Sequence, residues 1–174
     1  KIGASNYGSN EISVDFTNVY VTSPTDTADT INNKLSSGIE YIIITPGIYN
    51  FTSPITINKS NTIILGLGMA TLISGNGNAI IEISSNVDGV RIAGLLLQAG
   101  SIKSETLLSV GSISSISGNY KYNSSNPTIL YDIFARVGGT NDPSKFQVST
   151  TSMIDIYNDY VIIDNSWLWR ADHD

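Results

Sequence analysis

Short apolar segments, separated by residues that favour turns, recur along most of the chain. The stretch from residue 42 to residue 68 (IIITPGIYNFTSPITINKSNTIILGLG) contains several short runs of mainly apolar residues. The groups between them, such as Pro46-Gly47 and Gly66-Leu67-Gly68, predict turns that end each strand. Strands this short bury little surface alone, so the stretch predicts one coil of a stack in which each coil covers the next.

A longer pattern, in which a turn precedes an alternating strand and a second apolar run, appears repeatedly. We align its copies on Ile63, Val90, Ile129 and Val161. Unequal spacings within roughly 20–50 residues are typical of a solenoid whose turns carry insertions on one face. Asn or Asp precedes each copy, where a corner has to accept a left-handed backbone. Because stacked coils pair strand on strand, the repeats predict parallel sheets.

One segment has helical periodicity. Between residues 27 and 37 (TADTINNKLSS), the apolar residues Ala28, Ile31 and Leu35 fall on one face of a helix. Gly38 follows and can end the helix. A helix placed just before the first coil can cover apolar side chains and unpaired backbone at the end of a solenoid. We therefore predict one short capping helix.

The rest of the chain divides into an arm and coils. Residues 1–26 are expected to form an N-terminal arm with short strands at 12–16 and 19–21, where apolar residues recur at short spacing. Residues 42–174 are expected to form the coils. The 174 residues are enough for one all-β domain with a substantial core.

Composition excludes several classes of partner. The net charge is −6 and the pI is near 4.5, which argues against nucleic acid or an anionic membrane as partner. The absence of cysteine excludes a disulfide scaffold and a zinc–thiolate site. No apolar run approaches the roughly 20 residues that span a bilayer, so membrane insertion is not expected. The acidic residues are scattered, so we expect no metal and no cofactor.

The two ends of the chain and its sequons bear on processing. The chain begins at Lys1, without an initiator Met or a signal peptide, and stops at Asp174 directly after a strong strand pattern. This favours a processed or incomplete chain that lacks the C-terminal part of the solenoid. Three Asn-x-Ser/Thr sequons, at Asn50, Asn58 and Asn123, predict N-glycosylation and favour a secreted or cell-surface protein.

The segment TADTINNKLSSGIEYIIITPGIYNFTSPITI resembles the N-terminal signature of the pectate-lyase-like right-handed β-helix superfamily. In that signature a short helix leads to a strand and then to Pro-Gly-x-Tyr. The segments LGLGMATLISGNG, DGVRIAGLLLQAG, ILYDIFARVGG and IIDNSWLWRADHD are similar to a microbial group labelled glycoside hydrolase family 55-like. The resemblance covers roughly residues 19–174.

The resemblance implies a right-handed, single-stranded parallel β-helix, of which this chain is a portion. It also implies a secreted glycoside hydrolase that acts on a polysaccharide such as a β-1,3-glucan. Polygalacturonase motifs and the clustered ligands of a calcium-dependent lyase are absent. Since one fold hosts many functions, a non-catalytic glycan-binding or structural cell-surface β-helix is the alternative.

The densest polar cluster follows two tryptophans near the C-terminus. Trp167 and Trp169 offer flat apolar area on which a sugar ring can stack, and Arg170 can bind its hydroxyl groups. Asp172 and His173, the single histidine, are candidate catalytic residues. In the alternative interpretation the tryptophans fill the core and Asp172 pairs with Arg170.

A second candidate set comprises Asp132, Arg136 and Asp164. In our repeat alignment the two aspartates occupy equivalent positions of neighbouring coils, which would place them about one strand spacing, roughly 4.8 Å, apart. Carboxylates this close repel each other, which raises one pKa and suits acid–base chemistry. Retaining glycosidases hold their carboxyl groups about 5–5.5 Å apart and inverting ones about 6.5–9.5 Å apart. In the alternative interpretation both aspartates cap corners and Arg136, otherwise a substrate-binding residue, neutralises them.

Overall fold

The computed structural model describes residues 13–114, 122–138 and 148–171. Within them the chain is mostly β, with a single α-helix. In chain order the elements are η1 (Phe16–Asn18), β1 (Val19–Val21), α1 (Ala28–Ser36), β2 (Tyr41–Ile44), β3 (Ile48–Phe51), β4 (Ile55–Ile57), β5 (Ile63–Ser74), β6 (Ile81–Ile83), β7 (Arg91–Gln98), β8 (Leu108–Val110), β9 (Thr128–Val137), β10 (Ile154–Ile156), β11 (Val161–Asp164) and β12 (Trp167–Arg170).

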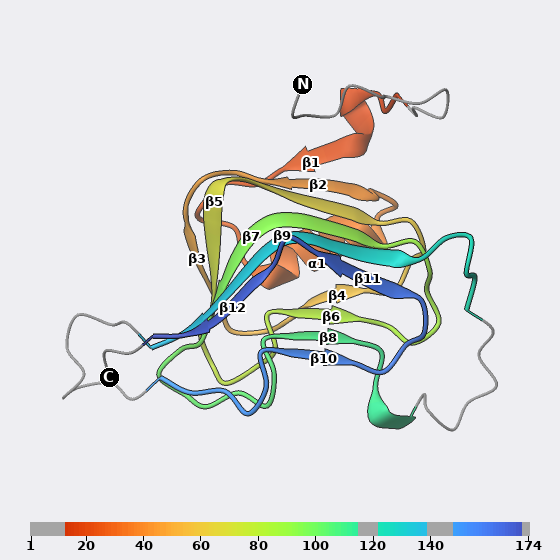
Figure 1. The fold of residues 1–174 in the computed structure, drawn as a ribbon. Helices are drawn as coiled ribbons and strands as arrows, with labels where there is room; N and C mark the ends of the chain where they lie inside the picture. The colour runs from red at the N-terminus through yellow and green to blue at the C-terminus, as the bar shows by residue number, and fades with distance from the viewer. Residues whose placement is uncertain (1–12, 115–121, 139–147, 172–174) are drawn as a thin grey trace, which may run out of the picture.

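The strands form two sheets, and all paired strands within each sheet are parallel. The first sheet has the order β1-β2-β5-β7-β9-β11, with β3 paired to β5 and β12 paired to β9. The second sheet has the order β10-β8-β6-β4. From β4 to β11 the chain passes alternately between the two sheets, as Figure 1 shows. The predicted parallel sheets are confirmed.

The long strands of the first sheet bend at residues with a left-handed backbone. Gly94 in β7 has a φ of +70° and Asp132 in β9 has a φ of +54°. These two residues stack, because Ala93 pairs with Tyr131 before the bend and Leu95 pairs with Ile133 after it. The bend divides the first sheet into two parts that face different directions.

In β5 the same bend contains extra residues. Its pairing with β7 shifts register between Leu65 and Ala70, and the strand continues to Ser74. The prediction that Gly66-Leu67-Gly68 ends a strand is therefore wrong. Turn-forming glycines are also suited to a bulge, where the chain kinks and then resumes its pairing.

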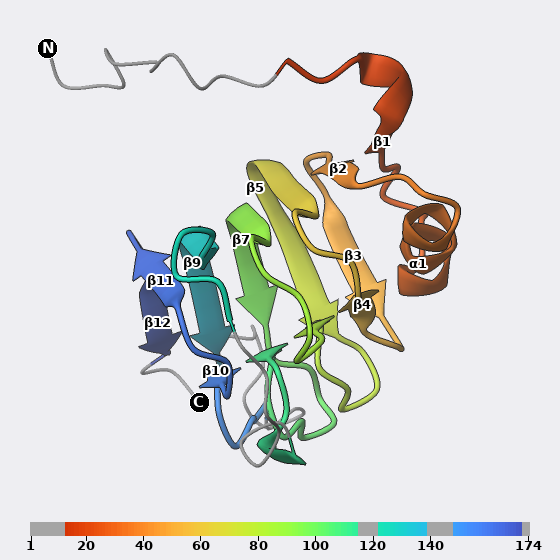
Figure 2. The same ribbon diagram turned by 90° about the vertical axis from the view of Figure 1, so that its right-hand side faces the viewer.

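The predicted capping helix is confirmed. Thr27 is its N-cap and accepts a hydrogen bond from the backbone N–H of Thr30 at 3.2 Å. Its apolar side chains, on Ala28, Ile31 and Leu35, are buried in the core. Figure 2 shows α1 beside β4 at the end of the stacked strands that comes first in the sequence.

The side chain of Asn32 joins this helix to the edge of the second sheet. Its amide donates to the carbonyl of Pro54 at 2.8 Å and accepts from the N–H of Thr56 at 2.9 Å. These backbone groups belong to the edge strand β4 and its entry, where no further strand is paired among the described residues. The helix therefore covers both the apolar core and the polar backbone of this end.

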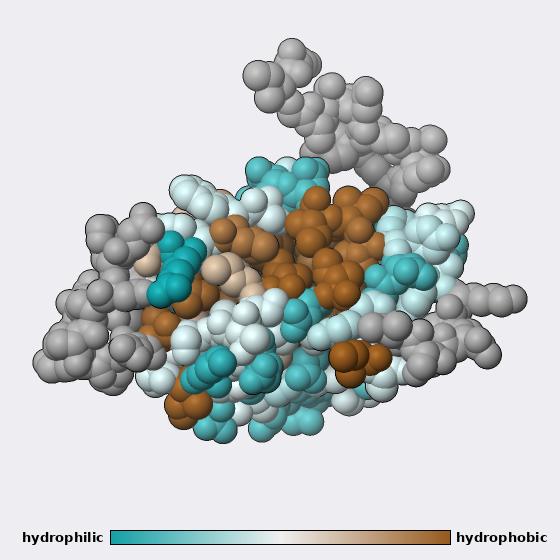
Figure 3. Space-filling view, turned by 60° about the horizontal axis from the view of Figure 1, so that its bottom comes forward, coloured by the Kyte–Doolittle hydropathy of each residue, from teal (hydrophilic) through white to brown (hydrophobic). Residues whose placement is uncertain are grey.

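At the opposite end, β10, β11 and β12 leave apolar side chains accessible. Leu168 pairs with the buried Ala135, yet it is 47% exposed. Ile156, Ile162 and Ile163 are also exposed. Figure 3 shows a large hydrophobic patch on this side of the molecule, above a mostly hydrophilic surface.

The N-terminal arm differs in part from the prediction. The strand expected at 19–21 is confirmed as β1, but Ser13 to Asp15 form no strand and Phe16–Asn18 is a 3-10 helix. Asp15 accounts for this difference, because its carboxylate accepts from the N–H of Thr17 at 2.8 Å and closes a local turn. Across the described residues, no helix has the length and apolar character that crossing a membrane requires.

Candidate functional site

Trp167 and Trp169 face outward from the last strand of the first sheet. Trp167 pairs with Phe134 and Trp169 pairs with Arg136 on the neighbouring strand β9. The two tryptophans are 60% and 41% exposed, so the alternative in which they fill the core is wrong. The ring of Trp167 lies 6.1 Å from that of Phe134 and 6.0 Å from that of Trp169, centroid to centroid.

The same outward positions on β7 extend this surface. Leu96 pairs with Phe134, and Gln98 pairs with Arg136. We use the name aromatic face for the six residues Leu96, Gln98, Phe134, Arg136, Trp167 and Trp169. The face combines a continuous apolar area with a polar margin, which is the combination that a sugar ring requires.

Arg136 provides the polar margin of the aromatic face. One of its guanidinium nitrogens donates a short hydrogen bond to the side-chain oxygen of Gln98. Its Nε is buried and has no hydrogen-bond partner among the described residues. A buried donor without a partner is costly, so the position of Arg136 is not set by hydrogen bonding of its Nε.

Asp132 lies at the bend, next to the aromatic face. The side chain of Asn165 donates to its Oδ1 at 3.2 Å. Asp132 and Phe134 both line a small cavity of about 100 Å³, whose other walls include Met69 and Gly94. The carboxylate of Asp132 therefore lies at a small cavity that adjoins the aromatic face.

The predicted stacking of Asp132 on Asp164 is wrong. Asp164 pairs with Tyr131, and the residue that follows it, Asn165, stacks on Asp132. The repeat alignment placed β11 one residue out of register, and such a slip moves every side chain to the opposite face. The alignment has the same error at β7, where Ile63 pairs with Arg91 and not with Val90.

The remaining predicted residues lie beyond the aromatic face. Arg170 is exposed at the end of β12, pairs with Val137 and lines a separate cavity of about 200 Å³. Asp172 and His173 lie outside the described residues, so their catalytic roles stay predictions. Ala171, immediately before them, is buried.

A second surface, which is polar, was not predicted from the sequence. The strands of the second sheet read ITI, IEI, LSV and IDI, and each has a polar residue between two apolar ones. The pairing stacks these central residues in one outward row of Thr56, Glu82, Ser109 and Asp155. The recurrence of this apolar-polar-apolar triplet was the signal that could have revealed the row.

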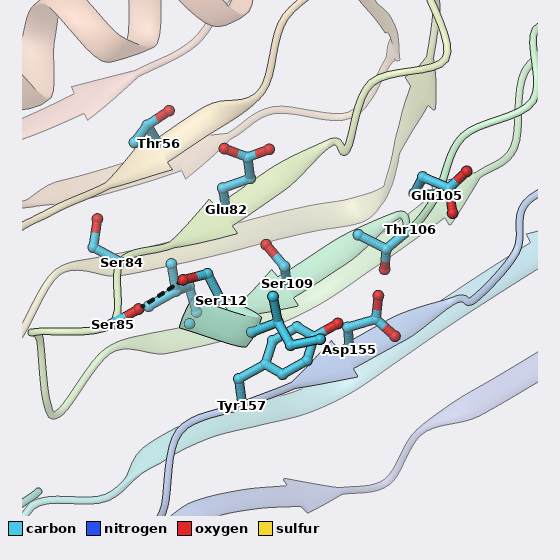
Figure 4. Close-up of a pocket in the computed structure, with 13 residues that line it drawn as sticks. Thr56, Glu82, Ser84, Ser85, Glu105, Thr106, Ser109, Ser112, Asp155 and Tyr157 are labelled. Atoms are coloured by element: carbon cyan, nitrogen blue, oxygen red, sulfur yellow. Dashed lines mark hydrogen bonds between the residues drawn. The ribbon is translucent and has the colours of Figure 1, made fainter. Parts of the chain in front are cut away.

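This row forms part of a groove of about 540 Å³, which we call the polar groove. Figure 4 shows its side chains converging from β6, β8, β10 and the segments around them. The groove shares no residue with the aromatic face. Within the part of the chain that the structure describes, no group of three or more acidic or histidine side chains could hold a metal ion.

The chain alternates between two parallel sheets, and an outward row of aromatic residues lies next to the bend of the first sheet. These features define a pectate-lyase-like β protein. The comparisons with known proteins agree. The family model of the LAM55 pectate lyase-like domain matches residues 19–174, so the chain belongs to this family. The resemblance seen in the sequence is thereby confirmed.

The chain is also similar to proteins from a Streptomyces strain. The chain is 46% identical over 154 residues to an exo-beta-1,3-glucanase of Streptomyces sp. (strain SirexAA-E / ActE), a match that covers 88% of this chain and 24% of the relative. It is also similar to the solved structure of sacteLam55A from Streptomyces sp. SirexAA-E and to that of a variant of it in complex with glucose. For both structures the TM-score is 0.79 and the identity 42%, over 90% of this chain and 26% of theirs. The chain thus spans about a quarter of the length of these relatives.

Proposed function

We propose that this protein is a glycoside hydrolase that acts on β-1,3-glucan, and that the aromatic face contacts the glucan. The membership of the LAM55 family and the identity to an exo-beta-1,3-glucanase support this proposal. The observation that carries it is the outward position of Trp167 and Trp169 beside Phe134. Exposed aromatic rings in a row have an evident use in stacking against sugar rings.

The neighbouring polar groups then orient the sugar. The guanidinium group of Arg136 can donate to a sugar oxygen, while the Oδ2 of Asp132 can accept from a sugar hydroxyl group. Glycoside hydrolysis takes two carboxyl groups, one of which donates a proton to the leaving oxygen. We assign one of these carboxyl groups to Asp172, which follows β12 with His173 beside it in the sequence, and Asp132 and Asp164 are the candidates for the other.

We also propose that the parallel sheets belong to a right-handed β-helix. Each connection from β4 to β6, from β6 to β8 and from β8 to β10 passes through a strand of the first sheet. Crossover connections between parallel strands are right-handed in nearly all proteins. A crystal structure of the full-length protein tests this, and left-handed or open connections would contradict it.

Secretion is part of the same proposal. The three sequon residues, Asn50, Asn58 and Asn123, are all exposed, so their side chains are accessible to a glycosyltransferase. A protein expressed through a eukaryotic secretory pathway should run at lower mass after treatment with an amidase that removes N-glycans. An unchanged mobility would argue against glycosylation.

The test of the function is the release of reducing sugar by the full-length protein. We expect release from laminarin, a β-1,3-glucan, and little or none from cellulose or starch. Replacing both tryptophans (Trp167→Ala with Trp169→Ala) should raise KM about thirtyfold, because stacking contributes on the order of 1 kcal/mol per aromatic ring. No release from any β-1,3-glucan would overturn the proposal.

A non-catalytic glycan-binding protein is the second candidate. It is favoured by the separation of Asp132 from Asp164, which leaves one carboxylate at the aromatic face among the described residues. Under this alternative the protein binds laminarin without product release, and Asp172→Asn leaves the affinity unchanged.

A further inference from the structure

The polar groove has the size and shape of a binding site. Its volume of about 540 Å³ falls within the range of roughly 300–1,000 Å³ typical of ligand pockets. The row at its base repeats at the spacing of parallel strands, about 4.8 Å. A surface that repeats polar groups in one direction suits a polymer that repeats them as well.

The charge of the groove restricts what it can bind. Three carboxylates line it, those of Glu82, Glu105 and Asp155, and no lysine or arginine of the described residues does. An anionic polymer such as a polyuronate would be repelled, because none of these lining residues would neutralise it. The groove is therefore suited to an uncharged ligand that donates hydrogen bonds.

The carboxylates are available to such a ligand. Within the described residues, no hydrogen bond or ion pair involves the side chains of Glu82 and Asp155. Glu82 projects outward, because Ile81 and Ile83 on either side of it are buried in the core, and Asp155 lies on the same face, because both residues pair with Ser109. An ionised carboxylate is an acceptor only, and a pair of sugar hydroxyl groups can donate to its two oxygens.

Hydroxyl and aromatic groups complete the lining. Ser84, Ser109 and Ser112 contribute hydroxyl groups, which both donate and accept. Tyr157 and Ile113 provide apolar surface at the end of the groove next to β10, as Figure 4 shows for the tyrosine. Acceptors, hydroxyl groups and one aromatic ring are the chemistry that recognises the polar edges and apolar faces of sugars.

We propose that the polar groove is a second saccharide site, which binds an uncharged glycan chain by hydrogen bonds to Glu82 and Asp155, apart from the aromatic face. The identification of that glycan as β-1,3-glucan rests on the proposed function. The existence of the site does not rest on the proposed function, because the groove and its charge are independent of the aromatic face.

The test is isothermal titration of the full-length protein with three oligosaccharides. A β-1,3-linked glucose hexamer, a β-1,4-linked glucose hexamer and a galacturonate hexamer are titrated into protein that carries Trp167→Ala and Trp169→Ala, so that the aromatic face is removed. Asp155→Asn and Glu82→Gln then remove one charge each from the groove. Asp159→Asn is the matched control, because Asp159 is exposed four residues further on and does not line the groove.

We expect the β-1,3 hexamer to bind to the tryptophan-deficient protein and the galacturonate hexamer not to bind. Asp155→Asn or Glu82→Gln should weaken binding about tenfold, since each loses charge-assisted hydrogen bonds, while Asp159→Asn changes it less than about twofold. Equal effects of Asp155→Asn and Asp159→Asn, or no binding of either neutral hexamer, would overturn the proposal. Binding of the β-1,4 hexamer alone, weakened by Asp155→Asn, would support the groove while contradicting β-1,3-glucan as the substrate.

Discussion

The aromatic face and the polar groove are built by the same structural device and have opposite chemistry. In both, parallel strands stack so that every second side chain points outward and equivalent residues form a row. On the first sheet the rows hold Leu96, Phe134 and Trp167, whereas on the second sheet the row holds Glu82, Ser109 and Asp155. The comparison shows that the backbone sets where the rows lie, while a few outward residues decide which ligand each face suits.

The two surfaces also differ in what lies beneath them. Ile81 and Ile83, on either side of Glu82, are fully buried. Leu168, between the two tryptophans, is 47% exposed because it lies on the last strand of the sheet. The part of the groove around Glu82 therefore rests on a closed core, whereas the end strands of both surfaces, β10 with the exposed Ile156 and β12 with Leu168, do not.

The largest expected effect comes from the bend that orients the aromatic face. Gly94→Ala should destabilise the protein by at least about 3 kcal/mol, because alanine is strained at a φ of +70° and its Cβ would lie 2.5 Å from the carbonyl oxygen of Gly66. Chemical denaturation measures this change.

Gly38→Ala is the control for that substitution. Gly38 also has a positive φ, of +104°, but no described atom lies within 4 Å of the position that the Cβ of an alanine would take there. Gly38→Ala should lower the free energy of unfolding by only about 1 kcal/mol, through backbone strain alone. Similar losses at both positions would show that crowding at the bend is unimportant.

The next effect compares the two cores. Ile81→Ala, beneath the groove, should cost about 2–5 kcal/mol, the range for emptying a buried aliphatic site. Leu168→Ala should cost less than about 1 kcal/mol, because its side chain already contacts water. The free energy of unfolding from urea titration distinguishes them, and a larger loss for Leu168→Ala would reverse the comparison.

A smaller effect separates binding from stability on the aromatic face. Trp169→Ala should weaken binding of the β-1,3-linked hexamer about fivefold and change the free energy of unfolding by less than about 1 kcal/mol. Phe16→Ala is the matched control, because Phe16 is an aromatic residue, 67% exposed, outside both surfaces. Affinity electrophoresis in laminarin gels tests this. Equal retardation of the two variants would show that Trp169 does not contact the glucan.

The smallest expected effect concerns Tyr20, which lies outside both surfaces and serves as a reference. A hydrogen bond to Asp26, together with burial, raises the pKa of Tyr20 to about 12. Since this pKa is higher in the folded state, the associated stabilisation is complete below about pH 10 and is lost as the pH rises through about 12. Ultraviolet difference titration should show one tyrosine ionising late in the folded protein, and Tyr20→Phe should remove that step.

Local signals in the sequence were sufficient for most of the elements. The helix at 28–36 was predicted from three apolar residues and a following glycine, and the short strands from their turns. The register was not, because adjacent residues in these apolar runs, such as Val161 and Ile162, are alike, and the alignment on Val161 was one residue out of register with β9. That is why Asp164 was placed opposite Asp132.

The candidate site was predicted in part. Trp167 and Trp169 do lie on one face, because period-two alternation puts residues i and i+2 of a strand on the same side. Arg136 was predicted in a separate set with Asp132 and Asp164, and it joins the tryptophans through its pairing with Trp169. The groove was missed because its residues are about one coil apart in sequence and only one strand apart in space. Glu82 and Asp155 become neighbours of Ser109 through pairing alone.

Tryptophan fluorescence tests the central claim most directly. The chain contains two tryptophans, Trp167 and Trp169, and both lie on the aromatic face. The difference in emission between the full-length protein and its variant with Trp167→Phe and Trp169→Phe therefore reports on that surface alone. We predict that the β-1,3-linked hexamer shifts this difference emission to shorter wavelength and saturates, and that the galacturonate hexamer has no effect. Binding or hydrolysis of β-1,3-glucan without any change in the emission of these tryptophans would contradict the claim that this face contacts the glucan.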